Sequence, residues 1–107
     1  MGKKKKGEQQ ESSKVRIPQE GEILGIVEMF VGGDKMRVIC DDGEERLCRI
    51  PGRLRKRVWI RVGDLILVRP WKYQKGRGDV IHVYTRTQAN WLKKNGHIKN
   101  LEIYYLF

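Results

Sequence analysis

Five short segments between residues 22 and 85 are rich in apolar residues, which alternate with polar ones in several of them, and turns rich in Gly and Asp separate most of the segments. Branched and aromatic residues at these spacings favour strands over helices. Gly32–Asp34 and Asp41–Glu44 are hairpin signals, because Gly and Asp tolerate the positive φ that such turns need. The first three strands are therefore expected to form a meander. The predicted strands are Glu22–Val31, Lys35–Asp41, Glu45–Ile50, Asp64–Arg69 and Asp79–Thr85.

The gap between the third and fourth strands differs in character from the other connections. Pro51-Gly52 interrupts the third strand, and Arg53–Val58 has the composition of a short helical turn. Five strands with an interruption after the third match the order of an OB-fold, a small Greek-key barrel that commonly binds nucleic acid. An SH3-like barrel fits the strand count almost as well. The long first strand, which contains Gly25 and must bend to serve both sheets, favours the OB-fold.

The two ends of the chain differ from the predicted barrel. Residues 1–14 hold hardly an apolar side chain, and we expect them to be disordered because they cannot bury enough surface to offset their ordering entropy. Thr85–Asn95 is typical of a helix, with Thr85 or Thr87 as its N-cap. Ile98–Phe107 is apolar enough to pack on the barrel, or otherwise to bind a partner.

The length of 107 residues corresponds to one domain. The expected fold class is mainly β, a five-stranded OB-fold barrel with a C-terminal α-helix and a disordered basic N-terminal tail. The tail is expected at 1–20, the RNA-binding barrel at 21–85, and the C-terminal helix with its apolar extension at 86–107.

The chain carries a formal net charge of +10, which makes a polyanion the first partner to consider. The stretch from Arg46 to Arg61 holds seven cations and no acid. Arg side chains pair bidentately with phosphate oxygens and stack on bases, so this stretch is the strongest binding signal in the sequence. Aromatic residues stand beside cations again, more weakly, at Trp71 and Tyr73. The candidate RNA contacts on this argument are Arg46, Arg53, Arg55, Lys56, Arg57, Trp59, Arg61, Lys72, Lys75 and Arg77.

Two parts of the basic sequence leave alternatives open. Leu54, Val58 and Ile60 alternate with the cations and are expected in the core, whereas Trp59 fits a hydrophobic plug or a base-stacking platform equally well. The N-terminal arm has the charge to contact nucleic acid, and a solvated tail that only aids solubility fits its composition as well. The candidate contacts in this arm are Lys3, Lys4, Lys5 and Lys6.

The sequence offers little for metal or catalytic chemistry. Cys40, Cys48, His82 and His97 lack the paired spacing of zinc sites, and the two Cys are expected as small core residues of a reduced protein. The acids between residues 41 and 45 have the chemistry to hold a metal for hydrolysis, but turn formation explains them more simply. We therefore expect no metal, no cofactor and no enzymatic activity.

Nothing in the sequence points to a membrane. No apolar run approaches the about 18–20 residues that a spanning helix needs. The start, Met1 to Lys6, continues into polar residues and lacks the apolar region of a secretory signal. We expect a cytoplasmic monomer.

The stretch Cys40–Ile60, which reads CDDGEERLCRIPGRLRKRVWI, closely resembles the translation initiation factor 1A family. This family comprises the archaeal and eukaryotic relatives of the smallest bacterial initiation factor. Gly63-Asp64, Ile66–Val68, Tyr73 and Asp79–Ile81 continue the resemblance, which covers about residues 21–95. A long ordered string matches rather than one short motif, so the resemblance is specific.

The resemblance implies an OB-fold that sits in the aminoacyl-tRNA site of the small ribosomal subunit during initiation. Such factors help to assemble the initiation complex, keep elongator tRNA out and tune start-codon selection with other factors, without enzymatic activity. The family's RNA contacts correspond here to Lys35, Arg46, Arg53, Arg55, Lys56, Arg57 and Trp59.

Two departures from the family pattern matter. Eukaryotic members end in a long acidic tail that contacts a partner GTPase factor, whereas Glu102 is the last acid before Phe107 here. We therefore expect an archaeal type of factor, with any contact to the GTPase factor moved to Ile98–Phe107. Pro51 also replaces a residue that is often cationic in the family.

Three other functions compete with an initiation factor. A single-strand RNA chaperone of cold-shock type needs aromatic residues on the second and third strands, and none lies between Lys35 and Ile50. A small nuclease would use Asp41, Asp42, Glu44 and Glu45. A protein-interaction module would act through Ile98–Phe107.

Overall fold

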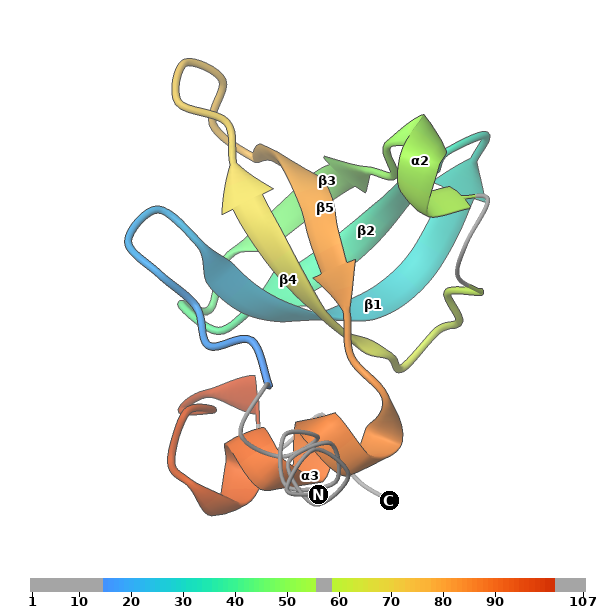
Figure 1. Cartoon of the computed structure of the whole chain (residues 1–107). Coiled ribbons are helices and arrows are strands. Elements are labelled where there is room, and N and C mark those ends of the chain that lie inside the picture. Colours follow the sequence, from blue (N-terminus) through green and yellow to red (C-terminus); the bar gives the residue numbers. More distant parts are fainter. Residues whose placement is uncertain (1–14, 56–58, 102–107) are drawn as a thin grey trace.

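The computed structural model describes residues 15–55 and 59–101 and contains a closed barrel of five strands (Figure 1). The strands are β1 (Ile23–Gly32), β2 (Lys35–Cys40), β3 (Glu45–Arg49), β4 (Leu65–Pro70) and β5 (Arg77–Val83). Around the barrel they follow the order β1-β2-β3-β5-β4. β3 and β5 run parallel, and the other neighbouring strands run antiparallel. The predicted OB-fold barrel is confirmed.

The last strand is the one whose position differs most from the prediction. β5 begins at Arg77 rather than at Asp79, because Arg77 pairs with Leu47 of β3. It ends at Val83, and Thr85 serves the following helix instead. Parallel pairing joins segments far apart in the sequence, so no local pattern places the start of β5.

The first strand closes the barrel by pairing on both of its edges. Gly25 lies opposite Cys40 of β2 and opposite Ile66 of β4. A Cβ atom at Gly25 would lie 2.5 Å from Val38 Cγ1 and 3.2 Å from the Ile39 carbonyl oxygen. The close approach of the two strands therefore needs a residue without a side chain at this position.

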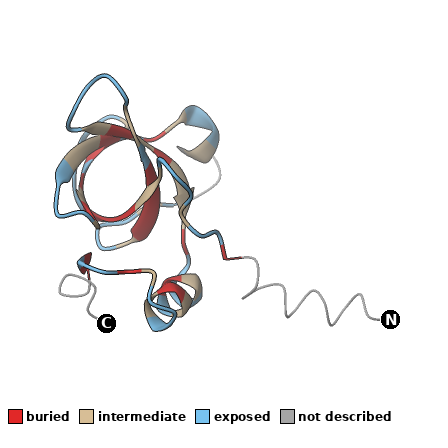
Figure 2. Cartoon of the chain, turned by 90° about the vertical axis from the view of Figure 1, so that its left-hand side faces the viewer, coloured by how far each residue is buried: buried red, intermediate tan, exposed pale blue. Residues whose placement is uncertain are grey.

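Two hydrophobic layers lie on opposite sides of the barrel wall. Buried residues make up much of the ring of strands, and α3 (Arg86–Lys94) lies beside the ring (Figure 2). β4 belongs to both layers, because Leu65 and Leu67 pack with α3 while Ile66 and Val68 fill the barrel. This double burial explains why β4 is one continuous apolar run. The buried residues of the barrel layer are Val27, Met36, Val38, Cys40, Cys48, Ile50, Ile66, Val68 and Val80.

The predicted C-terminal helix is confirmed, with Thr85 as its N-cap. Thr85 Oγ1 accepts a hydrogen bond from the Gln88 backbone N–H at 3.1 Å, and Gln88 Oε1 accepts one from the Thr85 N–H at 2.9 Å. This reciprocal pair satisfies two donors at the start of α3. Ala89 and Leu92 are buried in the layer between α3 and the barrel.

The segment after α3 packs on the barrel as far as the structure describes it. Ile98 and Leu101 are buried in the outer layer, and residues 102–107 of the predicted extension lie outside the described residues. Asp41 anchors the segment, because its carboxylate accepts the backbone N–H groups of Lys99 and Asn100 at 3.1 and 2.6 Å.

The other end of the chain also contacts the barrel. Val15 is buried in the outer layer, although it falls within the predicted tail. Glu22 joins this segment to β4, since its carboxylate forms ion pairs with Arg16 at 3.3 Å and with Arg69 at 3.2 Å. The predicted disordered residues 1–14 lie outside the described residues. Within the described part, no helix is long and apolar enough to cross a membrane.

We predict that Gly25→Ala lowers the free energy of unfolding by about 2 kcal/mol, because the added methyl group overpacks the contact between β1 and β2. Urea denaturation measures this change. Gly52→Ala is the matched control, since a Cβ atom there meets nothing within 4 Å and Gly52 begins the short helix α2 (Gly52–Arg55). The control should stay within about 0.5 kcal/mol of the parent. Equal losses in the two variants would contradict the close-approach argument.

Candidate nucleic-acid interface

The outer face of β2, β3, β5 and β4 carries a cross-strand row of charged side chains. Lys35 lies opposite Arg49, Arg49 opposite Asp79, and Asp79 opposite Arg69. The row points outward because Met36, its neighbour in β2, fills the barrel and alternate residues of a strand face opposite sides. Arg49 Nε lies 3.3 Å from Asp79 Oδ1. The row therefore sets three cations against one carboxylate.

Trp71 lies beside this row, directly after β4. Its backbone N–H donates to the Arg77 carbonyl oxygen at 2.9 Å. The guanidinium carbons of Arg49 and Arg77 lie 5.5 and 6.0 Å from the centre of the indole, within the range of cation–π attraction. With Lys35, these three residues line a hollow of about 230 Å³. We call it the cationic hollow, and Leu47 and Cys48 complete its lining.

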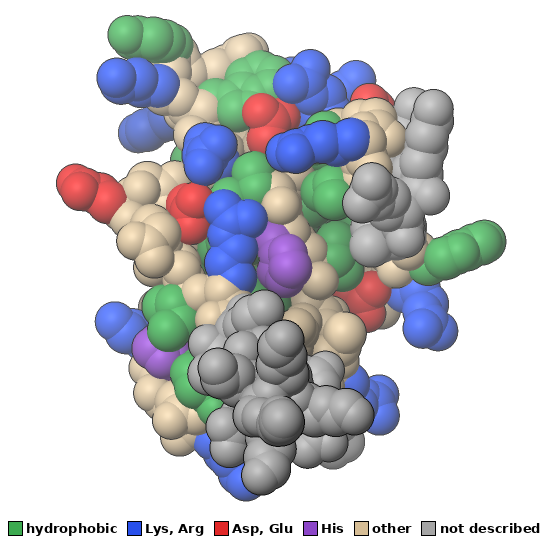
Figure 3. All heavy atoms as spheres, viewed as in Figure 1, with side chains coloured by type: hydrophobic (Ala, Val, Ile, Leu, Met, Phe, Trp, Pro, Cys, Tyr) green, Lys and Arg blue, Asp and Glu red, His purple; other side chains and the backbone are tan. Residues whose placement is uncertain are grey.

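The loop between β4 and β5 extends beyond the end of the barrel at which β4 ends (Figure 1). Tyr73 on this loop is 93% exposed, and Lys72 Nζ lies 5.8 Å from the centre of its ring. Lys75 is exposed on the same loop. Lys and Arg side chains gather over this end of the barrel (Figure 3). Of these predicted contacts, Arg77 lines the cationic hollow together with Lys35, and Lys72 and Lys75 lie on the loop that follows Trp71.

A second group of predicted contacts lies on α2 and the connection that follows it. Arg53 is exposed on α2, and Arg61 is exposed further along the connection, which runs away from the β4–β5 loop to the start of β4 (Figure 1). The Ile50 N–H donates to the Asp34 carbonyl oxygen at 2.8 Å and holds the start of α2 against the β1–β2 turn. Lys35, which follows Asp34, therefore lies between the two groups.

The structure decides between the two interpretations of Trp59. Its side chain is 88% exposed, so it is not a hydrophobic plug. Leu54 and Ile60 pack against the barrel layer, as the alternation predicts, whereas Val58 lies outside the described residues. An exposed indole between cations has the geometry of a stacking platform for a base.

Arg46 is held in an ion pair within the protein. Its Nη1 and Nη2 donate to Oδ1 and Oδ2 of Asp42 at 3.2 and 3.0 Å, and the side chain is only 16% exposed. The hydrogen bond to Asp42 raises the pKa of Arg46. Burial opposes ionisation of Asp42, but the hydrogen bonds from Arg46 and from the Glu44 N–H lower the pKa of its carboxyl overall. An RNA contact from Arg46 stays a prediction, and it requires this pair to open.

Several predicted contacts fall on residues about which the structure says little. Lys56, Arg57 and the arm from Lys3 to Lys6 lie outside the described residues, as does the side chain of Arg55. Arg49, by contrast, was absent from the predicted contacts and lies at the centre of the charged row. The alternation around buried Cys48 was the signal that could have placed Arg49 on the outer face.

The candidate metal and catalytic residues serve the fold. Burial raises the pKa of both cysteine thiols, that of Cys48 to about 12, so both remain neutral core side chains. Burial lowers the pKa of His82, which packs edge-on against Tyr84, and His97 stacks on the Trp91 ring. Among residues 15–55 and 59–101, no three His, Cys, Asp or Glu side chains gather as a metal site.

Comparison with known proteins identifies the family to which this chain belongs. The sequence model described as translation initiation factor 1A / IF-1 matches residues 12–103. This chain belongs to that family. It is 54% identical over 85 residues to translation initiation factor 1A of Methanopyrus kandleri, which covers 79% of this chain and 77% of the relative. It is 50% identical over 91 residues to the factor of Methanothermobacter thermautotrophicus, covering 84% of this chain and 92% of the relative.

A solved structure is also similar to this member of the initiation factor 1A family. It is a translation initiation factor from the Wolbachia endosymbiont strain TRS of Brugia malayi, with a TM-score of 0.49 and 28% identity. The likeness covers 62% of this chain and 79% of that one. The relatives are named as translation initiation factors, which is a non-enzymatic function. Two of the four residues of the nuclease alternative, Asp41 and Asp42, serve as structural acceptors.

We predict that Arg46→Ala lowers the free energy of unfolding at pH 7 by up to about 1 kcal/mol, since it removes a partly exposed bidentate ion pair. The pKa of Asp42 is lowered in the folded state, so its stabilising effect is present above its ordinary pKa of 3.8 and is lost as the pH falls through the lower folded value. Urea denaturation at pH 7 and in acid measures both effects. A loss that persists undiminished after Asp42 is protonated would contradict the ion-pair argument.

Proposed function

We propose that this protein is a translation initiation factor that binds rRNA at the aminoacyl-tRNA decoding site of the small ribosomal subunit. Bound there, it promotes assembly of the initiation complex and start-codon selection, and its volume excludes elongator tRNA. Phosphate contacts supply most of the affinity, while rRNA shape and unstacked bases supply the specificity. The protein acts in the cytoplasm as a monomer without a cofactor.

The observation that carries this proposal is an exposed surface that combines cations with aromatic rings on a barrel of this family. Arg53, Trp59 and Arg61 are exposed on and after α2, and the charged row with Trp71 lies on the neighbouring strands. Cations that neutralise phosphates and rings that stack on bases are the two elements of single-strand recognition. Because the relatives are named translation initiation factor 1A, we take the small ribosomal subunit as the target of this surface.

A contact with a partner GTPase factor through Ile98–Phe107 belongs to the same proposal. Ile98 and Leu101 are 5% and 0% exposed, because both are buried in the outer hydrophobic layer with residues of α3, β1 and β4. Neither side chain is therefore available to a partner. Within the described part of this segment, the partner would contact the exposed Lys99 and Asn100.

We predict that the double substitution Arg53→Ala and Arg61→Ala weakens binding to archaeal small ribosomal subunits. The slope of log affinity against log salt should fall by about one for each phosphate that is no longer neutralised. Co-sedimentation across a salt series, in the presence of unstructured competitor RNA, measures both quantities. The matched control is Lys94→Ala with Lys99→Ala, which removes the same charge from exposed residues of α3 and the segment after it.

The control should bind like the parent, at about one copy per subunit and resistant to the competitor. Equal weakening of both double variants would mean that overall charge alone drives binding. Binding of the parent protein that competitor RNA removes completely would mean that the surface is a general RNA clamp, and the proposed target would be wrong.

A further inference from the structure

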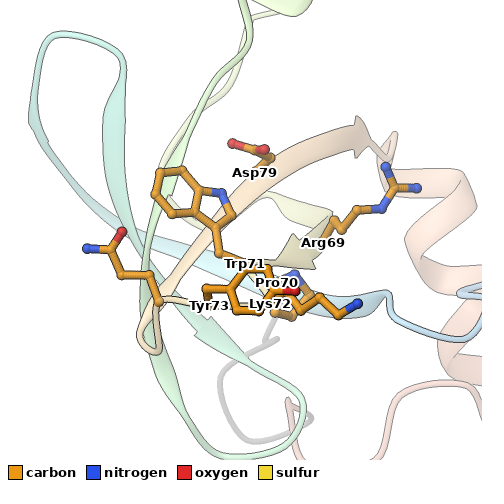
Figure 4. A pocket seen from close by; sticks show the side chains of 7 residues that line it. Arg69, Pro70, Trp71, Lys72, Tyr73 and Asp79 are labelled. Carbon is orange, nitrogen blue, oxygen red and sulfur yellow. The ribbon is translucent and has the colours of Figure 1, made fainter.

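Trp71 separates two hollows of different chemistry on the outer face of the barrel. The cationic hollow, on one side, contains Lys35, Arg49 and Arg77 and, among the described residues, no acid in its lining. The hollow on the other side measures about 510 Å³, within the usual size range of small-molecule sites. We call it the aromatic hollow, and its lining is Arg69, Pro70, Trp71, Lys72, Tyr73, Gln74 and Asp79 (Figure 4).

The cationic hollow fits a phosphate group. Lys35 and Arg49 face each other across β2 and β3, and Arg77 joins them from β5 through the parallel pairing of β5 with β3. Three cations from three strands converge on one small space, with Trp71 on its border. Guanidinium groups bind phosphate oxygens bidentately, and the strands fix the positions of their Cα atoms.

The aromatic hollow fits an unpaired base. Pro70, Trp71 and Tyr73 supply apolar and aromatic surface on which a base stacks. Asp79 extends from β5 to the side of the Trp71 indole, whereas Arg69 extends away from it (Figure 4). Asp79 is the one carboxylate among the described residues that line the two hollows.

The ion pair of Asp79 with Arg49 leaves one carboxylate oxygen of Asp79 without a hydrogen bond from the described residues. Its Oδ1 is shielded from solvent and receives no hydrogen bond from the described residues, although Arg49 Nε lies 3.3 Å away without hydrogen-bond geometry. Buried acceptors are rarely left unsatisfied. If Arg49 turned toward a phosphate, Asp79 would lose its cation, and its shielded oxygen would become open to hydrogen bonds from a base.

We propose that the two hollows together bind one unpaired RNA nucleotide, with its phosphate in the cationic hollow and its base stacked on Trp71 within reach of Asp79. The site selects guanine, because guanine presents two adjacent N–H donors to the two oxygens of a carboxylate. Uracil binds worst, because the carbonyl groups beside its one N–H repel the carboxylate. This inference rests on the proposed function only in taking RNA as the ligand.

The test compares two pentanucleotides, UUGUU and UUUUU, in fluorescence anisotropy titrations with the full chain. The parent protein should prefer UUGUU by about tenfold. Trp71→Ala should lose about tenfold in affinity for UUGUU, and Trp71→Phe should recover most of the loss because it restores a stacking surface. The control Lys94→Ala removes an exposed cation of α3 that lies outside both hollows, and it should keep the preference for guanine.

Asp79→Asn separates the role of the carboxylate from that of charge. An amide has one donor and one acceptor group, so it should reduce the preference for UUGUU to near parity. Removal of the negative charge should at the same time tighten binding of UUUUU. A merely structural Asp79 would lower both affinities equally and would contradict the inference.

Equal binding of the two pentanucleotides by the parent protein would overturn the inference, even if ribosome binding by the parent stays intact. A preference for guanine in a protein that fails to co-sediment with small ribosomal subunits would support the nucleotide site and reject the proposed function. The two proposals therefore fail on different measurements.

Discussion

The double pairing of β1 is the constraint on which the rest of the molecule depends. Gly25 pairs toward β2 on one edge and toward β4 on the other, and its missing side chain lets Val38 approach. Once β1 holds β4 in place, the remaining edges of β3 and β5 meet, and their parallel pairing closes the ring. That last pairing sets Arg49 beside Asp79 and Arg77 beside Leu47, so the charged row is a consequence of barrel closure.

One part of the outer barrel wall is covered by α3, and another part carries exposed cations. α3 covers the outer side of β1 and β4 with Ala89 and Leu92, and this burial gives β4 its unbroken apolar sequence. Ile39 of β2 and Ile81 of β5 also pack against the outer hydrophobic layer, whereas Lys35 and Arg49 on the outer side of β2 and β3 are exposed. Binding chemistry therefore occupies the part of the wall that the hydrophobic layers leave open.

Local patterns were enough to predict most of the fold, but only part of the candidate site. Alternation placed the strands, and Thr85 with the helical segment that follows placed α3, because both signals lie within a few residues. The start of β5 and the position of Arg49 depend on pairing with a distant strand, which a local pattern does not contain. Trp59 was ambiguous, since alternation gives its side but not whether another segment covers that side.

Three acids of the chain form contacts within the fold. Asp42 holds Arg46, Asp41 holds the segment after α3, and Glu22 holds Arg16 and Arg69 near the chain's other end. Asp41 and Asp42 are therefore unavailable to the exposed cations of the open wall, whereas Glu22 neutralises Arg69 at one end of the charged row. Asp79 differs, since it lies within the charged row and one of its oxygens receives no hydrogen bond from the described residues. A carboxylate weakens attraction for phosphate, so its position there is better explained by selection among bases than by affinity for the RNA backbone.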